Sequence, residues 1–324
     1  MVGNRDIRLR VRRFRSTALV TIVAVYFLIL VGGIVRATGS GMGCPDWPKC
    51  FDSWVPPTRE SQLPVDYQAI YAERGYRDVR FNPVKTWTEY VNRLMGVSIG
   101  LFIFMTLLQS FRVRQVSGSI PLACLAAILL VAVEGWLGSV LIETNLAGWA
   151  VTIHMLLALV IVGLLIFVVV RCRPVSYGIS GLLATARLSP LFAAVLFLTL
   201  VQIVLGTQVR EHVDVVASTL GDDRGAWIAK LGWTFLVHRS FSIALICANL
   251  LLVYRINRAT LSHGLLPSVG KVLLFVLALE VAAGAGLSYL EVPPILQPVH
   301  LLLAAVVAGL QFGMWSIFRF ERAA

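Results

Sequence analysis

Eight long apolar segments constrain the fold of this chain more than any other feature of its sequence. Each is close to the roughly 20 apolar residues that a helix needs to cross a bilayer. Because lipid offers no hydrogen bonds to the backbone, continuous apolar segments of this length favour transmembrane helices. The mean hydropathy of +0.81 agrees with an all-α, multi-pass membrane protein. The predicted spans lie near residues 16–37, 90–110, 120–142, 149–170, 188–209, 233–254, 270–290 and 296–318.

The distribution of Lys and Arg predicts the orientation of these spans. With the N-terminus inside, the inner segments hold most of the Lys and Arg but only two acids, Asp6 and Glu321. Cytoplasmic loops carry such an excess, so we expect both termini inside. In a bacterium the membrane would be the inner one. Topology and contact with anionic lipid then explain the net charge of +11, without nucleic acid. The first span lacks a small-residue cleavage site directly after it and is expected to be retained.

One stretch of the sequence occurs twice. Residues 134–158 and 280–304 each contain the end of an apolar helix, a short turn and a second apolar helix with a histidine near its start. An offset of 146 residues relates them and pairs Glu134 with Glu280 and His154 with His300. We expect these glutamates to form hydrogen bonds within the helix bundle.

The repeat predicts two related four-helix bundles. We expect the N-terminal bundle over residues 1–170, an inner linker over 171–187 and the C-terminal bundle over 188–324. The N-terminal half has a much longer outer loop, residues 38–89, than its counterpart. Extra length in one copy of a repeat indicates a local function or a lid.

Four positions are predicted to lie at similar depth near the outer face, because every even-numbered span enters from that side. They are Asn92, His154, His238 and His300, and the offset of 146 also pairs Asn92 with His238. A histidine within the membrane is costly and indicates a site. Two histidines from two helices of a bundle are a usual way to hold a haem iron. The alternative is that these histidines form hydrogen bonds between helices.

Charged residues accompany these positions. Arginines beside them, which can bind the propionates of a haem, are Arg36, Arg93, Arg210 and Arg239. Glu89 lies three residues before Asn92 and therefore shares its helix face. A carboxylate there is a candidate general acid or base. The alternative is a surface carboxylate that pairs with Arg93.

The remaining cysteines and histidines divide by location. Cys44 and Cys50 lie together in the first outer loop, where they are a candidate structural disulfide or redox pair. Residues expected to pack inertly in or near spans are Cys124, Cys172 and Cys247. His212 and His263 fall in predicted loops and are expected to be solvated.

The motifs together resemble the haem A synthase family of aerobic bacteria and mitochondria. The most specific is G-G-I-V-R-A-T-G-S-G-M-G-C-P-D-W-P-K-C, which ends at Cys50. The others are W-T-E-Y-V-N-R-L-M-G, which contains Glu89, H-M-L-L-A at His154, V-H-R-S-F at His238 and Q-P-V-H-L-L at His300. The resemblance covers essentially the whole chain.

The resemblance implies a cofactor, a substrate and a reaction. It implies haem b held by His238 and His300 in the C-terminal bundle, and haem O as substrate in the N-terminal bundle, where His154 matches a family histidine. The C8 methyl of haem O would become the formyl group of haem A, for cytochrome oxidase, by successive hydroxylation. Glu89 matches the essential glutamate of the family, and Cys44 and Cys50 match its outer-loop cysteine pair.

The chain also departs from the family pattern. The family commonly has histidine at the position of Asn92 and glutamine at that of Glu134. An amide is a poor ligand for iron, so a membrane b-type cytochrome that only transfers electrons is the alternative function. Haem O synthase, an unassigned electron donor, membrane lipid and a second copy of the chain are the candidate partners.

Overall fold

The computed structural model describes residues 2–172, 188–221, 223–259 and 264–321. These residues form helices and no strand, apart from one isolated bridge between Cys50 and Ser53. Eight of the helices are long and apolar enough to cross a membrane, which confirms the prediction of an all-α, multi-pass membrane protein. They are α1 (Val2–Ala37), α3 (Pro83–Ser110), α4 (Ser119–Glu143), α5 (Gly148–Arg171), α7 (Leu188–Leu220), α9 (Gly232–Ala259), α10 (Leu265–Tyr289) and α11 (Leu296–Glu321).

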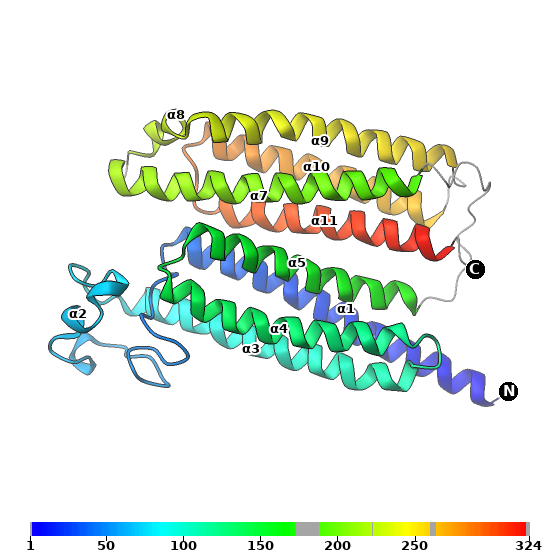
Figure 1. Cartoon of the computed structure of the whole chain (residues 1–324), viewed down its shortest axis with the longest axis horizontal. Coiled ribbons are helices and arrows are strands. Elements are labelled where there is room, and N and C mark those ends of the chain that lie inside the picture. Colours follow the sequence, from blue (N-terminus) through cyan, green and yellow to red (C-terminus); the bar gives the residue numbers. More distant parts are fainter. Residues whose placement is uncertain (1, 173–187, 222, 260–263, 322–324) are drawn as a thin grey trace.

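The long helices pack in two groups, which Figure 1 shows side by side. In the first group, α1 and α4 each pack against α3 and α5. In the second, α7 and α10 each pack against α9 and α11. Contacts between the groups run from α11 to α1 and α5, and from α5 to α7. The helices α3 and α5, and likewise α9 and α11, therefore lie diagonally across their groups.

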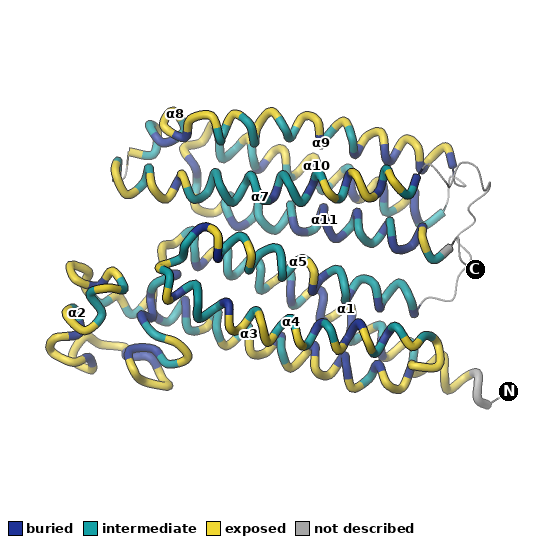
Figure 2. The backbone as a smooth tube through the Cα atoms, in the orientation of Figure 1, coloured by how far each residue is buried: buried dark blue, intermediate teal, exposed yellow. Residues whose placement is uncertain are grey.

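Burial follows this packing. Figure 2 shows more buried and half-buried positions on α1, α5 and α11, between the groups, and more exposed ones on the outward side of α9. The exposed side chains include large apolar ones such as Leu101 on α3 and Ile243 on α9, as expected for a surface that faces lipid. Some buried polar side chains are paired between helices, as in the hydrogen bond of 2.9 Å from Gln311 Nε2 to Asn249 Oδ1.

Several helices extend beyond their predicted spans, and α3 begins at Pro83, within the predicted outer loop 38–89. The Arg-rich segment before residue 16 is helical from Val2, and α7 continues to Leu220, beyond the predicted end of its span at 209. The added turns of α7 are stabilised by an ion pair of 2.9 Å between Arg210 and Asp214, four residues apart. They also bury Val213 against Trp227 and other apolar side chains. Hydropathy reports where a span is apolar, not where its helix ends.

Both chain ends lie at one end of the molecule in Figure 1, opposite α2 (Tyr67–Ile70) and α8 (Trp227–Lys230). The two chain ends lie together because eight long helices cross the molecule an even number of times. That this end faces the cytoplasm stays a prediction. The expected inner linker, 171–187, lies outside the described residues from 173 onward.

The first outer loop folds around its own apolar cluster. The ring of Phe51 makes edge contacts with the rings of Tyr67, Tyr71, Tyr76 and Phe81. Burial, and then the nearby carboxylates of Asp46 and Asp52, raises the pKa of Tyr71 to about 12. The phenol of Tyr71 is therefore neutral at physiological pH.

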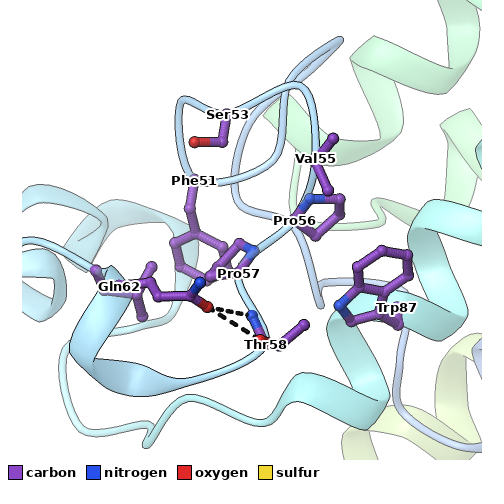
Figure 3. Close-up of a pocket in the computed structure, with 9 residues that line it drawn as sticks. Phe51, Ser53, Val55, Pro56, Pro57, Thr58, Gln62 and Trp87 are labelled. Carbon is purple, nitrogen blue, oxygen red and sulfur yellow. Dashed lines mark hydrogen bonds between the residues drawn. The ribbon is translucent and has the colours of Figure 1, made fainter.

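A cavity of about 300 Å³ opens beside this cluster (Figure 3). The backbone N–H and the hydroxyl of Thr58 both donate to Gln62 Oε1, at 2.6 and 3.1 Å. The lining residues are Phe51, Ser53, Val55, Pro56, Pro57, Thr58, Gln62, Leu63 and Trp87. No acid, histidine or cysteine is among them, so this cavity offers no proton-transfer or metal-binding group.

Candidate functional site

Two histidines meet in the interior of the second helix group. His238 lies on α9 and His300 on α11, and their ring centroids are 6.4 Å apart with ring planes at 80°. A metal bound at about 2.0 Å to one nitrogen of each imidazole places the two centroids on the order of 6 Å apart. The spacing of this pair therefore fits one iron held axially between two histidines.

Glu280 on α10 fixes the ring of His300. Nδ1 of His300 lies 3.1 Å from Glu280 Oε1 and 3.2 Å from the Glu280 backbone oxygen. The backbone oxygen and an ionised carboxylate oxygen can only accept hydrogen bonds, so this contact favours the imidazole tautomer with its proton on Nδ1. Nε2 is then the nitrogen left for a metal. A ligating histidine usually donates its second N–H to a carboxylate or carbonyl in this way.

Glycines make room for both rings. A Cβ at Gly206 on α7 would lie 3.3 Å from Cε1 of His238, and one at Gly284 on α10 would lie 3.1 Å from Cε1 of His300. Such contacts are closer than ordinary van der Waals distances, so a larger residue would push the imidazoles out of place. Gln202 Nε2 donates a hydrogen bond of 3.0 Å to the backbone oxygen of His238.

The first helix group repeats the carboxylate–histidine pair. Nδ1 of His154 on α5 contacts the carboxylate of Glu134 on α4. This is the pair that the offset of 146 residues matches with His300 and Glu280. The sequence predicted hydrogen bonds for both glutamates but not that histidine would be the partner in each half.

The surroundings of His154 are more open than those of its counterpart. Gly138 corresponds to Gly284 by the offset of 146, and Gly32 lies four residues before Arg36 as Gly206 does before Arg210. A Cβ at Gly32 or Gly138 would meet no atom within 4 Å. Asn92, which replaces the second histidine, has a buried Oδ1 without a hydrogen-bond partner among the described residues. The first group thus has one anchored histidine and space beside it.

Glu89 is buried, with 3% of its surface exposed, and both of its oxygens have partners. Oε2 accepts from the backbone N–H of Cys44 at 2.8 Å, and Oε1 accepts from Nε of Arg93 at 3.1 Å. The alternative interpretation, a surface carboxylate that pairs with Arg93, was therefore wrong about exposure and correct about the ion pair. The catalytic role of Glu89 stays a prediction.

Arg93 and Glu89 together hold the first outer loop against α3. Nη1 of Arg93 donates to the backbone oxygens of Asp46 and Lys49, at 2.7 and 2.9 Å. The segment that it holds is closed by a disulfide between Cys44 and Cys50, whose Cα atoms are 4.9 Å apart. Arg93 was predicted to bind a propionate, but here its guanidinium binds the loop.

Arg36 and Arg210 share one carboxylate between the two helix groups. Nη2 of Arg36 on α1 lies 2.8 Å from Oδ2 of Asp214, and Nη1 of Arg210 lies 2.9 Å from Oδ1. Asp214 was not predicted as a site residue, although it lies four residues after Arg210, a spacing that favours an ion pair on a helix. Arg239 is exposed, with its guanidinium 5.7 Å from the centre of the Phe235 ring.

Several other predictions can be placed. His212 is exposed, as predicted, but on α7 and not in a loop, while His263 lies outside the described residues. Cys124 and Cys172 are buried, whereas Cys247 is exposed on α9. No cluster of three or more potential metal ligands occurs among the described side chains.

Comparison with known proteins agrees with this arrangement. The heme A synthase of Shewanella oneidensis is 27% identical over 213 residues, 65% of this chain and 62% of that protein. That of Rhodopseudomonas palustris is 30% identical over 62% of this chain and 58% of the relative, so both alignments span less than two thirds of the relatives' length. The heme A synthase of Rickettsia prowazekii is 21% identical over 93% of this chain and 96% of its own.

The family model COX15-CtaA, described as cytochrome oxidase assembly protein, matches residues 15–312. That match includes the histidines and glutamates of both histidine sites. The chain therefore belongs to the COX15-CtaA family of cytochrome oxidase assembly proteins.

Proposed function

We propose that this protein is a haem A synthase, an oxidoreductase that converts the C8 methyl group of haem O to the formyl group of haem A. The observation that carries this proposal is the carboxylate–histidine pair present in both halves, Glu134 with His154 and Glu280 with His300. A protein that acts on one haem with the help of another needs two such sites. The relatives named heme A synthase support the same activity.

The C-terminal half, 188–324, is the proposed site of haem b. His238 and His300 would hold its iron, and Gly206 and Gly284 keep the space that their rings occupy. When bound there, haem b supplies electron transfer. Among the proposed propionate partners, Arg239 is exposed and ready to bind an anion, whereas Arg210 already holds Asp214.

The N-terminal half, 1–170, is the proposed site of the substrate, haem O. His154 would bind its iron, and Asn92 lies where the second half has a histidine. Arg36 and Arg93 are the proposed propionate partners, and either would have to exchange a protein oxygen for a propionate. Glu89 is proposed as the acid or base at the outer edge of this site.

The protein is a multi-pass protein of the bacterial inner membrane, as its eight apolar helices and its family indicate. We propose that both termini face the cytoplasm, because the Arg-rich start of α1 lies at that end. The histidine sites then lie toward the outer face. Haem O synthase, an electron donor and a second copy of the chain remain proposed partners.

Pigment analysis tests the proposed function. Cells that make haem O but no haem A are given this chain, and their extracted haems are separated by chromatography. Haem A is expected only when the chain is present. A b-type cytochrome that only transfers electrons, which the replacement of a histidine by Asn92 favours, would instead leave haem O unchanged.

Glu280→Ala is expected to weaken the binding of haem b by about 10–100-fold, the usual effect of losing an outer partner of a ligating histidine. The reason is that the ring of His300 loses the acceptors that hold its Nδ1–H. Glu280→Gln keeps an acceptor oxygen and should retain the haem. Haem content of the purified protein measures the effect, with Glu291→Gln in the exposed turn after α10 as control. Wild-type haem content in Glu280→Ala would contradict this role.

A further inference from the structure

The two histidine sites share one candidate ligand and differ in the other. His154 and His300 are matched in position and in their contact with a glutamate. Across the bundle, His238 in the second half corresponds to Asn92 in the first. The replacement of a candidate ligand is therefore confined to one of the two sides of the first site.

The shared side shows that the first site remains built to bind a metal. The carboxylate of Glu134 occupies Nδ1 of His154, which leaves Nε2 for iron, as in the second site. A histidine without a ligand role would not require Glu134, which lies about two and a half helical turns before the end of α4. Burying the carboxylate of Glu134 in a membrane helix is unfavourable, which indicates that its contact with His154 has a function.

The opposite side has a polar group without a partner. Oδ1 of Asn92 is buried and accepts no hydrogen bond from any residue that the structure describes. Leaving a buried acceptor unpaired costs on the order of 1–3 kcal/mol, unless a ligand or water donates a hydrogen bond to it. The side-chain amide also carries two N–H donors. Asn92 can therefore interact with a small polar molecule but is a poor ligand for iron.

The space for such a molecule comes from glycines. Gly32 and Gly138 have no atom within 4 Å of an added Cβ, whereas their counterparts in the second half touch the histidine rings. The side chain of His154 is also more exposed, at 39%, than that of His300, at 26%. The first site is the more open of the two.

We propose that the first half holds the iron of its substrate haem through His154 alone, and that the opposite axial position is open to a small ligand of the dioxygen class, with the amide of Asn92 beside it. This inference rests on the proposed function, because it requires haem O in the first half. The polarity and the hydrogen-bond donors of a distal pocket decide whether a haem binds such ligands. The second half, with histidines on both sides, excludes them.

Carbon monoxide is the probe for the open position. The full-length protein is purified from cells that supply haem O, reduced with dithionite and exposed to carbon monoxide. The wild-type protein is expected to give an adduct with haem O and none with haem b. Asn92→His should reduce the adduct to background and give a low-spin spectrum in its place. The reciprocal change, His238→Asn, should create a new adduct with haem b.

Asn92→Leu tests the amide itself. It should keep the adduct but raise the C–O stretching frequency, because the polar donor near the bound ligand is lost. An unchanged frequency would show that Asn92 does not face the ligand and would overturn its assigned place. A low-spin haem O without an adduct in the wild-type protein would overturn the open position, and would indicate another ligand such as Met95, one turn along α3.

These outcomes are distinct from failure of the proposed function. If haem A forms but haem O binds no carbon monoxide, the function stands and the open position is wrong. If haem A does not form but the loaded protein still gives an adduct that Asn92→His removes, the open position stands and the synthase assignment is wrong.

Discussion

Replacement of His300 by Ala is expected to remove most of the low-spin b-type haem spectrum of the purified protein. His300 supplies one of two imidazoles whose centroids are 6.4 Å apart, the distance that suits one iron between them. Loss of a direct ligand should weaken haem binding at least as much as the roughly 10–100-fold caused by loss of an outer partner. His238→Ala should have the same result, because both faces of the iron need a strong ligand for a low-spin state.

The control is His212→Ala, which removes an exposed histidine on α7. This variant should keep the full spectrum and show that removal of a histidine as such does not disturb the protein. Retention of the wild-type spectrum in both His238→Ala and His300→Ala would end the assignment of this site to haem b. Size-exclusion chromatography of each variant in detergent shows whether the apoprotein remains folded.

The helical framework could be predicted from the sequence because backbone groups in lipid must form their hydrogen bonds within the segment. Segments without charge must be helical and about 20 residues long, so the cores of all eight spans were placed correctly. The repeat also placed the histidines, since His154 and His300 occupy matching positions on α5 and α11. These features depend on local composition and on spacing along the chain.

The partners of the buried charges could not be predicted in the same way. Glu280 contacts His300 across a turn of known length, yet only the packing of α10 against α11 decides which side chains meet. Asp214 joins Arg36 and Arg210 between the two helix groups, and its position depends on an extension of α7 that hydropathy does not record. Contacts of this kind are set by tertiary packing.

The asymmetry of the two halves has a physical basis in the same contacts. In the second half, Gly206 and Gly284 pack closely against the rings of His238 and His300. The first half keeps one histidine and has a folded loop, held by Arg93, above its bundle. A permanent cofactor requires a closed site, whereas a substrate haem must enter and leave. The proposed assignment of haem b to the second half and haem O to the first follows this difference.

Glu89→Ala is expected to abolish the formation of haem A while it leaves the haem b spectrum intact. The carboxylate is buried and paired with the guanidinium of Arg93, so its removal leaves a buried charge without its partner. Breaking such a pair typically costs about 3–5 kcal/mol. The damage should stay in the first half, because every partner of Glu89 lies in the first outer loop or on α3.

A second variant separates the two roles that Glu89 can have. Glu89→Gln keeps an acceptor for the backbone N–H of Cys44 but can no longer carry a proton. If Glu89 is the acid or base, this variant should also lose haem A, while the loop closed by the Cys44–Cys50 disulfide stays as resistant to protease as in the wild type. If Glu89 acts by holding the loop, haem A formation and protease resistance should fall together in Glu89→Ala and both recover in Glu89→Gln.

Extracted haems, separated by chromatography, measure the product, and Glu73→Ala in the same loop is the matched control. The Glu73 residue is exposed and contributes only its backbone oxygen to a hydrogen bond, so its replacement should leave the haem A yield unchanged. A near-normal yield of haem A from Glu89→Ala would rule out both roles. His154 would then be the first-half residue on which the proposed reaction depends, because its ring, in contact with Glu134, is the proposed metal-binding group of that half.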